Sequence, residues 1–564
     1  MTALVATIVV VSSTLLVGVW GVRHARTTST FLVANRSVHP VMNAFAVCGE
    51  YLSAGSYLGL AGLVVIFGVD ILWLPVGWTA GYVFLLLFVA APLRRFGAYT
   101  IPEFAEGRLG SRRLRVVSAC FVLVISVMYL LPQMKGAGVV LQQLVGAPYW
   151  VGVFLIGTVV AIGLSTGGMR SITFIQAFQF VLIAVGVVVP LALLGWGSDE
   201  ALVPTATDQP PAFDQATQVT YPRDVVLSLD QPTTVIVVDA SGTGEALEIG
   251  PGRFEVTGGT ELRWSAGTPV PHVSDLEPTA EDEWAVPFLG SDLAGGHPLY
   301  FAFSALVASA LGTMGLPHVL VRFYTNPDGN TARRTTVWVL ALLGPYYSLI
   351  PLYSLFARQA TPEVLSTGDT EVVSLVVTDT LLSGGFGEAA TAVIAAGAVA
   401  AMLSTSAGLL ISVAGALSHD FTTGGVPQFR RAAWAGAAVA MLLGLIAQPF
   451  DISIMVSWAF AVAASSFCPL LILGIWWSGL TERGALAAML VGGSSATLAI
   501  LWAMVSGPQS GWAEALTSAP AAWSVPLAVG VAVIVSRLDP MKVDDVHQTM
   551  AVMHLPDHRL AVEG

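Results

Sequence analysis

The residues best suited to bind a ligand interrupt an apolar run at 41–69, where residues 43–59 read NAFAVCGEYLSAGSYLG. A glutamate at mid-depth in a bilayer is costly, so it should face a cavity or a partner. Glycine and serine permit a break in the helix, and the freed backbone carbonyls then become ligands for a hard cation. The alternative is a kinked helix whose small residues only pack against neighbours. We favour the cavity, because the polar residues gather in a single span.

A second polar group lies in the run 386–418, which is rich in small residues. Ser404 and Thr405 are adjacent hydroxyls, and with the carbonyl of Ala401 they offer the oxygen ligands that sodium prefers. Serine and threonine in membrane helices more often bond to their own backbone or pack between helices. The pattern alone therefore leaves both interpretations open.

Lys135 is one of two lysines in the chain and lies well inside the apolar run 114–146. A lysine buried among membrane helices needs a partner. Glu50 is the natural intramembrane candidate, and an anionic substrate is another. The alternative is a lysine that extends to the membrane surface.

The composition of the chain is that of a membrane protein. Of its 564 residues, 55% are hydrophobic and only 11% are charged. Soluble proteins average about 25% charged residues, so a soluble enzyme is excluded. A nucleic-acid-binding protein is excluded as well, because it would need basic patches. We also expect no membrane-embedded enzyme, since no nucleophile motif or His/Asp/Glu constellation is present.

Recurring apolar runs of about 20 residues predict an all-α polytopic membrane protein with about 13 transmembrane helices. The predicted spans are 4–22, 41–69, 71–93, 114–146, 149–168, 171–196, 297–318, 334–358, 386–418, 430–449, 452–477, 484–506 and 521–537. Arginines cluster in alternate turns between them, beginning with Arg23 and Arg26. This alternation predicts an N-terminus outside the cell and a C-terminus in the cytoplasm.

One shift in composition divides the chain. Residues 197–296 contain 17 acidic and three basic residues, a net charge of −14, so the total of −12 leaves +2 for the rest. Runs of β-type residues at 225–229, 233–238 and 253–256 predict a small extracytoplasmic β insert near 221–275. It is either a solvated decoration or a lid or docking module for an extracytoplasmic partner. The predicted organisation is helices 1–6 in 1–196, the insert in 197–296, helices 7–13 in 297–537 and a cytoplasmic tail in 538–564.

Four stretches resemble the sodium/solute symporters, and most closely the bacterial cation/acetate-type monocarboxylate symporters. They are GEYLSA at 49–54, STGGMRS at 165–171 with Gln176, GTMGLPHVLVRFY at 312–324 and AMLST at 401–405. The resemblance implies a fold like that of the leucine transporter, in which spans two to six and seven to eleven are five-helix repeats of inverted topology. The chain departs from the family at Glu50, where we expect aspartate, at Lys135, where we expect a small or apolar residue, and in its longer insert.

The resemblance also implies that sodium is the coupling ion and that it binds between spans two and nine. Its ligands would be the carbonyls of Gly49, Leu52 and Ala401 and the hydroxyls of Ser404 and Thr405.

We therefore expect sodium-coupled symport of a small monocarboxylate, such as acetate, propionate or pyruvate, across the plasma membrane of a bacterium. Half-helix N-termini and neutral donors would meet the carboxylate. The candidate substrate contacts are Glu50, Tyr51, Ser53, Gln133, Lys135, Ser309 and Thr313. The alternatives are proton-coupled uptake of another small solute, and a solute sensor built on a transporter body.

Several further side chains have a structural interpretation. We expect His318 and Arg322 to orient the inner end of span seven and to meet lipid headgroups, with a gating role for His318 as the alternative. We expect most of five tryptophans to anchor their helices at the membrane interface, namely Trp73, Trp78, Trp150, Trp476 and Trp477.

Overall fold

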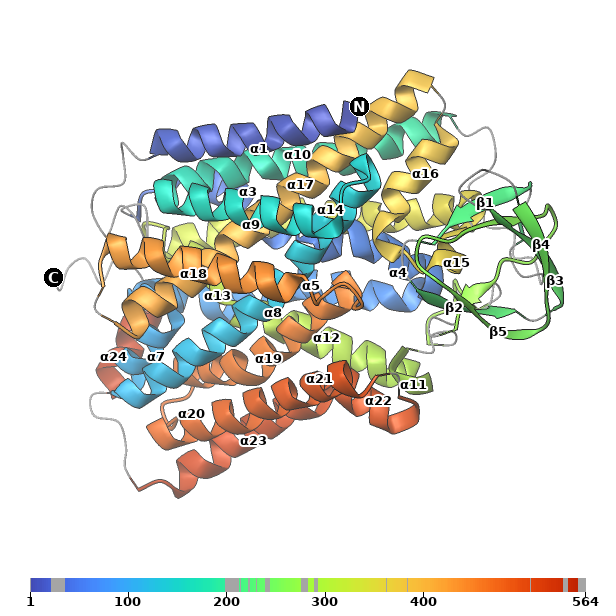
Figure 1. The fold of residues 1–564 in the computed structure, drawn as a ribbon. Coiled ribbons are helices and arrows are strands. Elements are labelled where there is room, and N and C mark those ends of the chain that lie inside the picture. The colour runs from blue at the N-terminus through green and yellow to red at the C-terminus, as the bar shows by residue number, and fades with distance from the viewer. Residues whose placement is uncertain are drawn as a thin grey trace.

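Long apolar helices form most of the structure, a computed structural model that carries a β module at one end of the helices (Figure 1). The described residues are 2–21, 36–197, 212–213, 215–221, 224–229, 231–238, 244–274, 283–288, 293–361, 363–382, 384–422, 424–507, 509–540 and 546–555. Arg23, Arg26 and the end of the predicted tail lie outside them.

The helices of the first half precede the insert. They are α1 (Thr2–Gly21), α3 (Pro40–Tyr51), η2 (Gly55–Gly59), α4 (Leu60–Phe67), η3 (Gly68–Leu72), α5 (Trp73–Phe84), η4 (Leu85–Val89), α6 (Ala90–Phe96), α7 (Ile101–Leu109), α8 (Arg112–Val145), α9 (Tyr149–Thr166) and α10 (Met169–Gly197).

The helices of the second half follow the insert. They are α11 (Leu293–Gly296), α12 (Pro298–Gly315), α13 (Pro317–Phe323), α14 (Gly329–Ala360), α15 (Glu363–Thr367), η5 (Thr370–Val372), α16 (Val373–Leu381), α17 (Gly384–Gly415), η6 (Ala416–Asp420), α18 (Val426–Gly444), α19 (Ile452–Trp476), α20 (Glu482–Ala488), η7 (Met489–Gly493), α21 (Ser494–Ser506), α22 (Gly511–Ser518), α23 (Ala521–Leu538) and α24 (Val546–His554).

Ten helical segments among the described residues are long and apolar enough to cross a membrane. Three differences separate this number from the predicted 13. The segment Gly55–Phe96 joins two predicted spans, Thr2–Val17 is shorter than the others, and α18 carries Arg430 and Arg431 in its first two turns. The count of 13 crossings stays a prediction.

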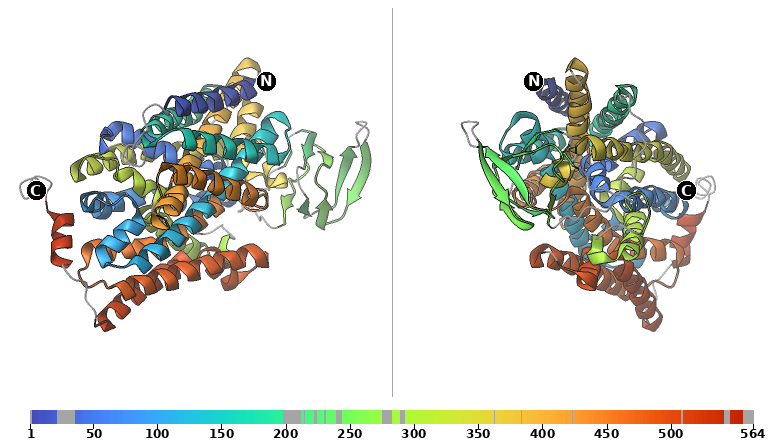
Figure 2. Two further views of the ribbon diagram at one scale, coloured as in Figure 1. Left: turned by 60° about the vertical axis from the view of Figure 1, so that its left-hand side comes forward. Right: turned by 90° about the vertical axis from the view of Figure 1, so that its right-hand side faces the viewer.

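Seven strands lie among the described residues of the insert, and they form two antiparallel sheets. They are β1 (Thr217–Thr220), β2 (Val225–Leu229), β3 (Thr233–Val238), β4 (Gly244–Ile249), β5 (Gly252–Val256), β6 (Glu261–Trp264) and β7 (His272–Val273). Their order is β1-β6-β3-β4 in one sheet and β5-β2-β7 in the other. Fully buried side chains alternate with less buried ones along β2, as expected where one face of a sheet covers a core. The left view of Figure 2 shows the sheets projecting beyond the helix ends.

The chain returning from the insert is fixed to the ends of two helices. The indole Nε1 of Trp284 donates a hydrogen bond to the carbonyl of Val64 in α4 at 2.7 Å, and the guanidinium of Arg358 in α14 lies 5.0 Å from the centre of the indole. The backbone N–H of Phe288 donates to the Asp70 carboxylate at 2.9 Å. Gly68, whose φ is +72°, turns the chain between α4 and α5 beside Trp284.

Close contacts between helices depend on small residues. α12 packs between α5 and α19, and α10 packs between α3 and α17. A Cβ on Gly77 of α5 would lie 2.6 Å from Cβ of Ser309, and one on Gly312 would lie 2.5 Å from the carbonyl oxygen of Phe460. Without these side chains the backbones approach closely, as in other membrane helix pairs. The close approach brings the polar residues of α12 up against α5.

Candidate functional site

The predicted break in the first polar span lies between α3 and η2. α3 ends at Tyr51, the backbone of Leu52 is extended (φ −75°, ψ 92°), and helical structure resumes at Ala54. The side-chain oxygen of Gln133 in α8 accepts a hydrogen bond from the freed N–H of Ala54 at 2.9 Å. This hydrogen bond therefore stabilises the break. Breaks of this kind expose backbone groups to ligands in the binding sites of transporters.

A second break separates α12 from α13. α12 ends at Gly315, Leu316 is extended (φ −72°, ψ 116°), and α13 starts at Pro317, which has no N–H to lose at a first helical position. The Tyr51 hydroxyl and Oγ1 of Thr313 lie 2.8 Å apart, so a hydrogen bond connects the two interrupted helices.

Glu50 forms a buried ion pair with Arg322. Nε of Arg322 lies 2.5 Å from Oε2 of Glu50, and both side chains are at most 2% exposed. The guanidinium also donates to Oγ1 of Thr173 at 3.0 Å and to the side-chain oxygen of Gln176. The expectation that Arg322 meets lipid headgroups was therefore wrong, because the charge of Glu50 holds it inside the protein.

Gln176 extends this ion pair to α17. Its Nε2 donates to the carbonyl of Ser404 at 2.9 Å and lies 3.4 Å from Oε2 of Glu50. On the other side of the carboxylate, a Cβ on Gly408 would lie 1.8 Å from Oε1 of Glu50. The Glu50 carboxylate thus fills the space beside Gly408, and its charge is paired with that of Arg322.

Lys135 does not pair with Glu50, and that prediction was wrong. Its ammonium forms a buried ion pair with Glu371 in η5 and donates to the carbonyl of Phe450 at 2.7 Å. Arg322 already satisfies Glu50, while Lys135 lies in the part of α8 that η5 contacts. Because both charges are paired within the protein, we do not propose Glu50 or Lys135 as a substrate contact.

Four of the five predicted sodium ligands surround the first break. Oγ1 of Thr405 lies 3.4 Å from the carbonyl oxygen of Leu52. A Cβ on Gly49 would lie 3.2 Å from Oγ of Ser404, and this buried hydroxyl has no hydrogen-bond partner among the described residues. Ala401 is fully buried one turn before Thr405 in α17, but it makes no polar contact with the break in the described structure.

The neutral candidates for substrate contact are all buried near the two breaks. Ser53 lies in the break itself, Gln133 supports it, and Tyr51 and Thr313 bond to each other. Ser309 lies one turn before Thr313, and its hydroxyl has no partner among the described residues. These groups can donate hydrogen bonds to an anion without adding charge.

Aromatic residues pack around these groups, and the sequence did not single out three of them: Tyr82, Tyr129 and Phe460. Ring centroids are 4.8 Å apart for Tyr51 and Tyr82, 6.2 Å for Trp78 and Phe460, and 5.7 Å for Tyr129 and Phe460. Trp78 is only 2% exposed, so its expected place at the membrane interface was wrong. Aromatic residues are common on both lipid-facing and buried faces, and the sequence held no signal of the face that Trp78 occupies.

A cavity of about 700 Å³ lies between the insert and the helices; we call it the insert-side cavity. The insert contributes Asp224, Val225 and Val226 to its wall, and Lys135 and Glu371 line it from the helices. Asp451 also lines it and caps α19 by accepting hydrogen bonds from two backbone N–H groups. Burial and the neighbouring Glu371 carboxylate raise the pKa of Asp451 to about 6, against the opposing effect of Lys135.

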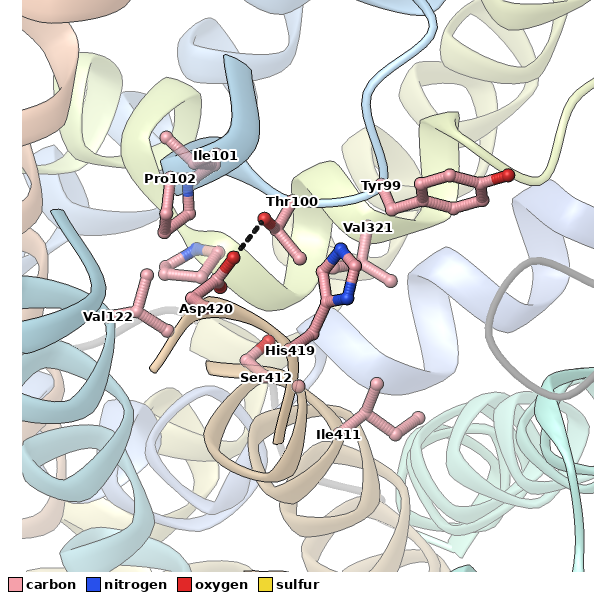
Figure 3. Close-up of a pocket in the computed structure, with 12 residues that line it drawn as sticks. Tyr99, Thr100, Ile101, Pro102, Val122, Val321, Ile411, Ser412, His419 and Asp420 are labelled. Atoms are coloured by element: carbon pink, nitrogen blue, oxygen red, sulfur yellow. Dashed lines mark hydrogen bonds between the residues drawn. The ribbon is translucent and has the colours of Figure 1, made fainter. Parts of the chain in front are cut away.

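A much smaller pocket, about 30 Å³, lies at the opposite end; we call it the far-end pocket. Figure 3 shows Thr100, which hydrogen-bonds Asp420 at 3.0 Å, and His419 beside them. Nη2 of Arg115 lies 3.1 Å from the same Asp420 carboxylate. Burial raises the pKa of Glu103, but the neighbouring His419, whose Nε2 lies 3.8 Å from the carboxylate, and a hydrogen bond from the N–H of Tyr99 lower it by more, so the net shift is downward. Charged contacts therefore connect α7, α8 and η6 at this end.

A model of the sodium:solute symporter family matches residues 31–239 and 294–492, which is more than half of the chain. An uncharacterized symporter of Bacillus subtilis is 27% identical over 511 residues, covering 89% of this chain and 86% of the relative. A Corynebacterium glutamicum protein named as a monocarboxylic acid transporter is 27% identical over 559 residues, covering 94% of this chain and 90% of the relative. The family match omits residues 240–293, which belong to the acidic insert.

Two solved structures share the fold. A Na⁺-coupled sialic acid symporter in a substrate-bound outward-open state aligns with a TM-score of 0.66 at 12% identity, over 96% of this chain and 98% of that one. The nucleobase-cation-symport-1 family transporter Mhp1 aligns with a TM-score of 0.50 at 12% identity, over 93% and 99%. Both have the leucine-transporter fold, which confirms the predicted fold class.

Gly408→Ala should destabilise the protein, because its Cβ would overlap the Glu50 carboxylate that Arg322 holds in place. Overpacking of this kind costs about 1–3 kcal/mol, and we expect a lower thermal unfolding midpoint in detergent together with slower uptake. Gly415→Ala, in the same helix with nothing within 4 Å, is the matched control and should not lower the midpoint. Equal midpoints for the two variants would contradict the packing described for Glu50.

Lys135→Met should destabilise the protein by about 3–5 kcal/mol, because it leaves the Glu371 carboxylate buried without its cation. The double variant Lys135→Met/Glu371→Met should recover most of that loss in a thermal unfolding measurement. Arg112→Met removes a partly exposed ion pair with Glu106 and should cost at most about 1 kcal/mol. A double variant no more stable than the single one would argue against the pairing of Lys135 with Glu371.

Proposed function

The chain belongs to the sodium:solute symporter family, and we propose that it uses a sodium gradient to drive uptake of a small monocarboxylate, such as acetate, propionate or pyruvate, across the plasma membrane of a bacterium. It is a multi-pass membrane transporter and not an enzyme. The orientation that we propose has the N-terminus and the insert outside the cell.

The proposal of sodium is carried by the hydroxyl of Ser404, which has no hydrogen-bond partner in the part of the chain that the structure describes. A buried hydroxyl without a hydrogen bond is costly, and one beside an interrupted backbone is well placed to bind a cation. The carbonyl of Leu52 and the hydroxyl of Thr405 provide further oxygen atoms on the same side of the break. Gly49 lacks a side chain where one would crowd Ser404. We propose Gly49, Leu52, Ala401, Ser404 and Thr405 as the ligands.

A monocarboxylate is supported by the polarity of the two breaks. The charges of Glu50 and Arg322 cancel each other, and so do those of Lys135 and Glu371. What remains near the breaks are neutral groups on Tyr51, Ser53, Gln133, Ser309 and Thr313, surrounded by aromatic rings. Neutral donors beside an apolar wall suit a short acyl chain with one carboxylate. The name of the Corynebacterium relative points in the same direction.

Sodium binding can be coupled to substrate binding because the proposed sodium ligands lie on two different elements. Gly49 and Leu52 belong to the first interrupted helix, whereas Ser404 and Thr405 belong to α17. A cation between them stabilises one arrangement of the two repeats, and a substrate that prefers this arrangement then binds more tightly. The same linkage requires the substrate to raise the affinity for sodium.

Purified protein in vesicles should accumulate labelled acetate, propionate or pyruvate when a sodium gradient is imposed. Ser404→Ala and Thr405→Ala should each raise the sodium concentration for half-maximal uptake about tenfold, since one lost ligand worth about 1.4 kcal/mol changes affinity by that factor. Ser412→Ala is the matched control, because this hydroxyl bonds to the backbone of its own helix.

Uptake driven only by a proton gradient would exclude sodium as the coupling ion, but the protein would still be a transporter. Failure to accumulate all three acids would reject the substrate class, and a wider screen of solutes would then separate another substrate from a sensor.

A further inference from the structure

His318 is a fully buried histidine whose two ring nitrogens both lack a hydrogen-bond partner among the described residues. It follows Pro317 at the start of α13, directly after the second break. A buried polar group without a partner has lost its hydrogen bonds to water and calls for an explanation. Neither of the two roles expected from the sequence accounts for it, because the ring is fully buried among the helices and does not line the far-end pocket.

The surroundings of His318 lead to the candidate substrate groups. Its ring centroid lies 5.3 Å from that of Tyr129 in an edge-to-face arrangement. Tyr129 packs on Phe460, and Phe460 lies 6.1 Å from Tyr51, whose hydroxyl bonds to Thr313. His318 therefore belongs to the aromatic surroundings of the two breaks.

Charged groups on the neighbouring elements are already engaged. Arg322, one turn further along α13, is paired with Glu50 of α3. Arg94 of α6 donates to the carbonyls of Asn326 and Pro327. On η6, His419 and Asp420 face the Pro317 and Val321 side of α13 across the far-end pocket. On α8, the nearest titratable group is Tyr129. None of these contacts uses a ring nitrogen of His318.

We propose that His318 is a specificity-determining contact for the substrate, and that an N–H of its imidazole donates a hydrogen bond to the substrate carboxylate. This inference rests on the proposed function, since it presumes a carboxylate substrate. A neutral imidazole has one N–H donor and one acceptor nitrogen, so it can donate to the carboxylate without taking up a proton. The contact adds no charge to the buried site, and affinity for the carboxylate should therefore depend little on pH in the range in which exposed histidines titrate.

The test is initial uptake of labelled pyruvate, acetate and propionate into vesicles under a fixed sodium gradient, between about pH 5.5 and 8. Pyruvate is the most informative of the three, because it stays ionised throughout, and uptake by sodium-free vesicles is subtracted. In the unmodified protein KM should change little with pH. His318→Phe, which keeps a ring against Tyr129 but has no donor, should have a KM about tenfold higher with little change in maximal rate. His318→Gln, which keeps an N–H donor, should have a KM between the two.

Two controls separate this role from a structural one. His272→Phe changes a histidine in the β insert and should keep the KM of the unmodified protein. Both His318 variants should retain thermal stabilisation by sodium, because the proposed sodium ligands are unchanged. If His318→Phe keeps the KM of the unmodified protein, the inference is overturned and the proposed function stands. If the unmodified protein takes up none of the three acids, both are overturned.

Discussion

The buried ion pair of Glu50 and Arg322 constrains the rest of the transport region. Two charges removed from water are stable only when they meet at short range and their remaining hydrogen bonds are satisfied. Glu50 on α3 therefore requires α13 to bring Arg322 within reach, and α10 to supply Gln176 and Thr173. It also requires α17 to leave room with Gly408. One carboxylate thus fixes the relative positions of four helices, including both interrupted ones.

Charge and binding are assigned to different residues in this arrangement. Glu50 with Arg322, and Lys135 with Glu371, hold elements together and cancel in charge. The groups left to meet ligands are hydroxyls, amides, carbonyls and rings, which can bind and release a small ion without a large electrostatic barrier. The two ends of the helices differ, with a large cavity at the insert end and charged contacts between helices at the far end.

The sequence predicted the fold class and the location of the first break, because polar residues within an apolar run are conspicuous. It did not predict the partners of the charged residues. Arg322 is 272 positions from Glu50, and Glu371 is 236 positions from Lys135. Glu371 lies outside every predicted span, whereas Glu50 lies within one. The pattern therefore favoured Glu50 as the partner of Lys135. Pairing across such separations depends on how helices are rotated and stacked, which the pattern of a single helix does not encode. The same limit applies to Trp78, whose type is compatible with either face.

The attachment of the β insert has a consequence of its own. Trp284 bonds to α4 and lies against Arg358 of α14, and these helices belong to different repeats. Rotation of one repeat against the other must therefore strain or shift this attachment, which couples a water-exposed module to motion inside the membrane. An antibody or designed binder that locked the insert against the helix ends would arrest the cycle without entering the bilayer. In the orientation that we propose, the insert lies outside the cell, and such a binder would reach it from that side.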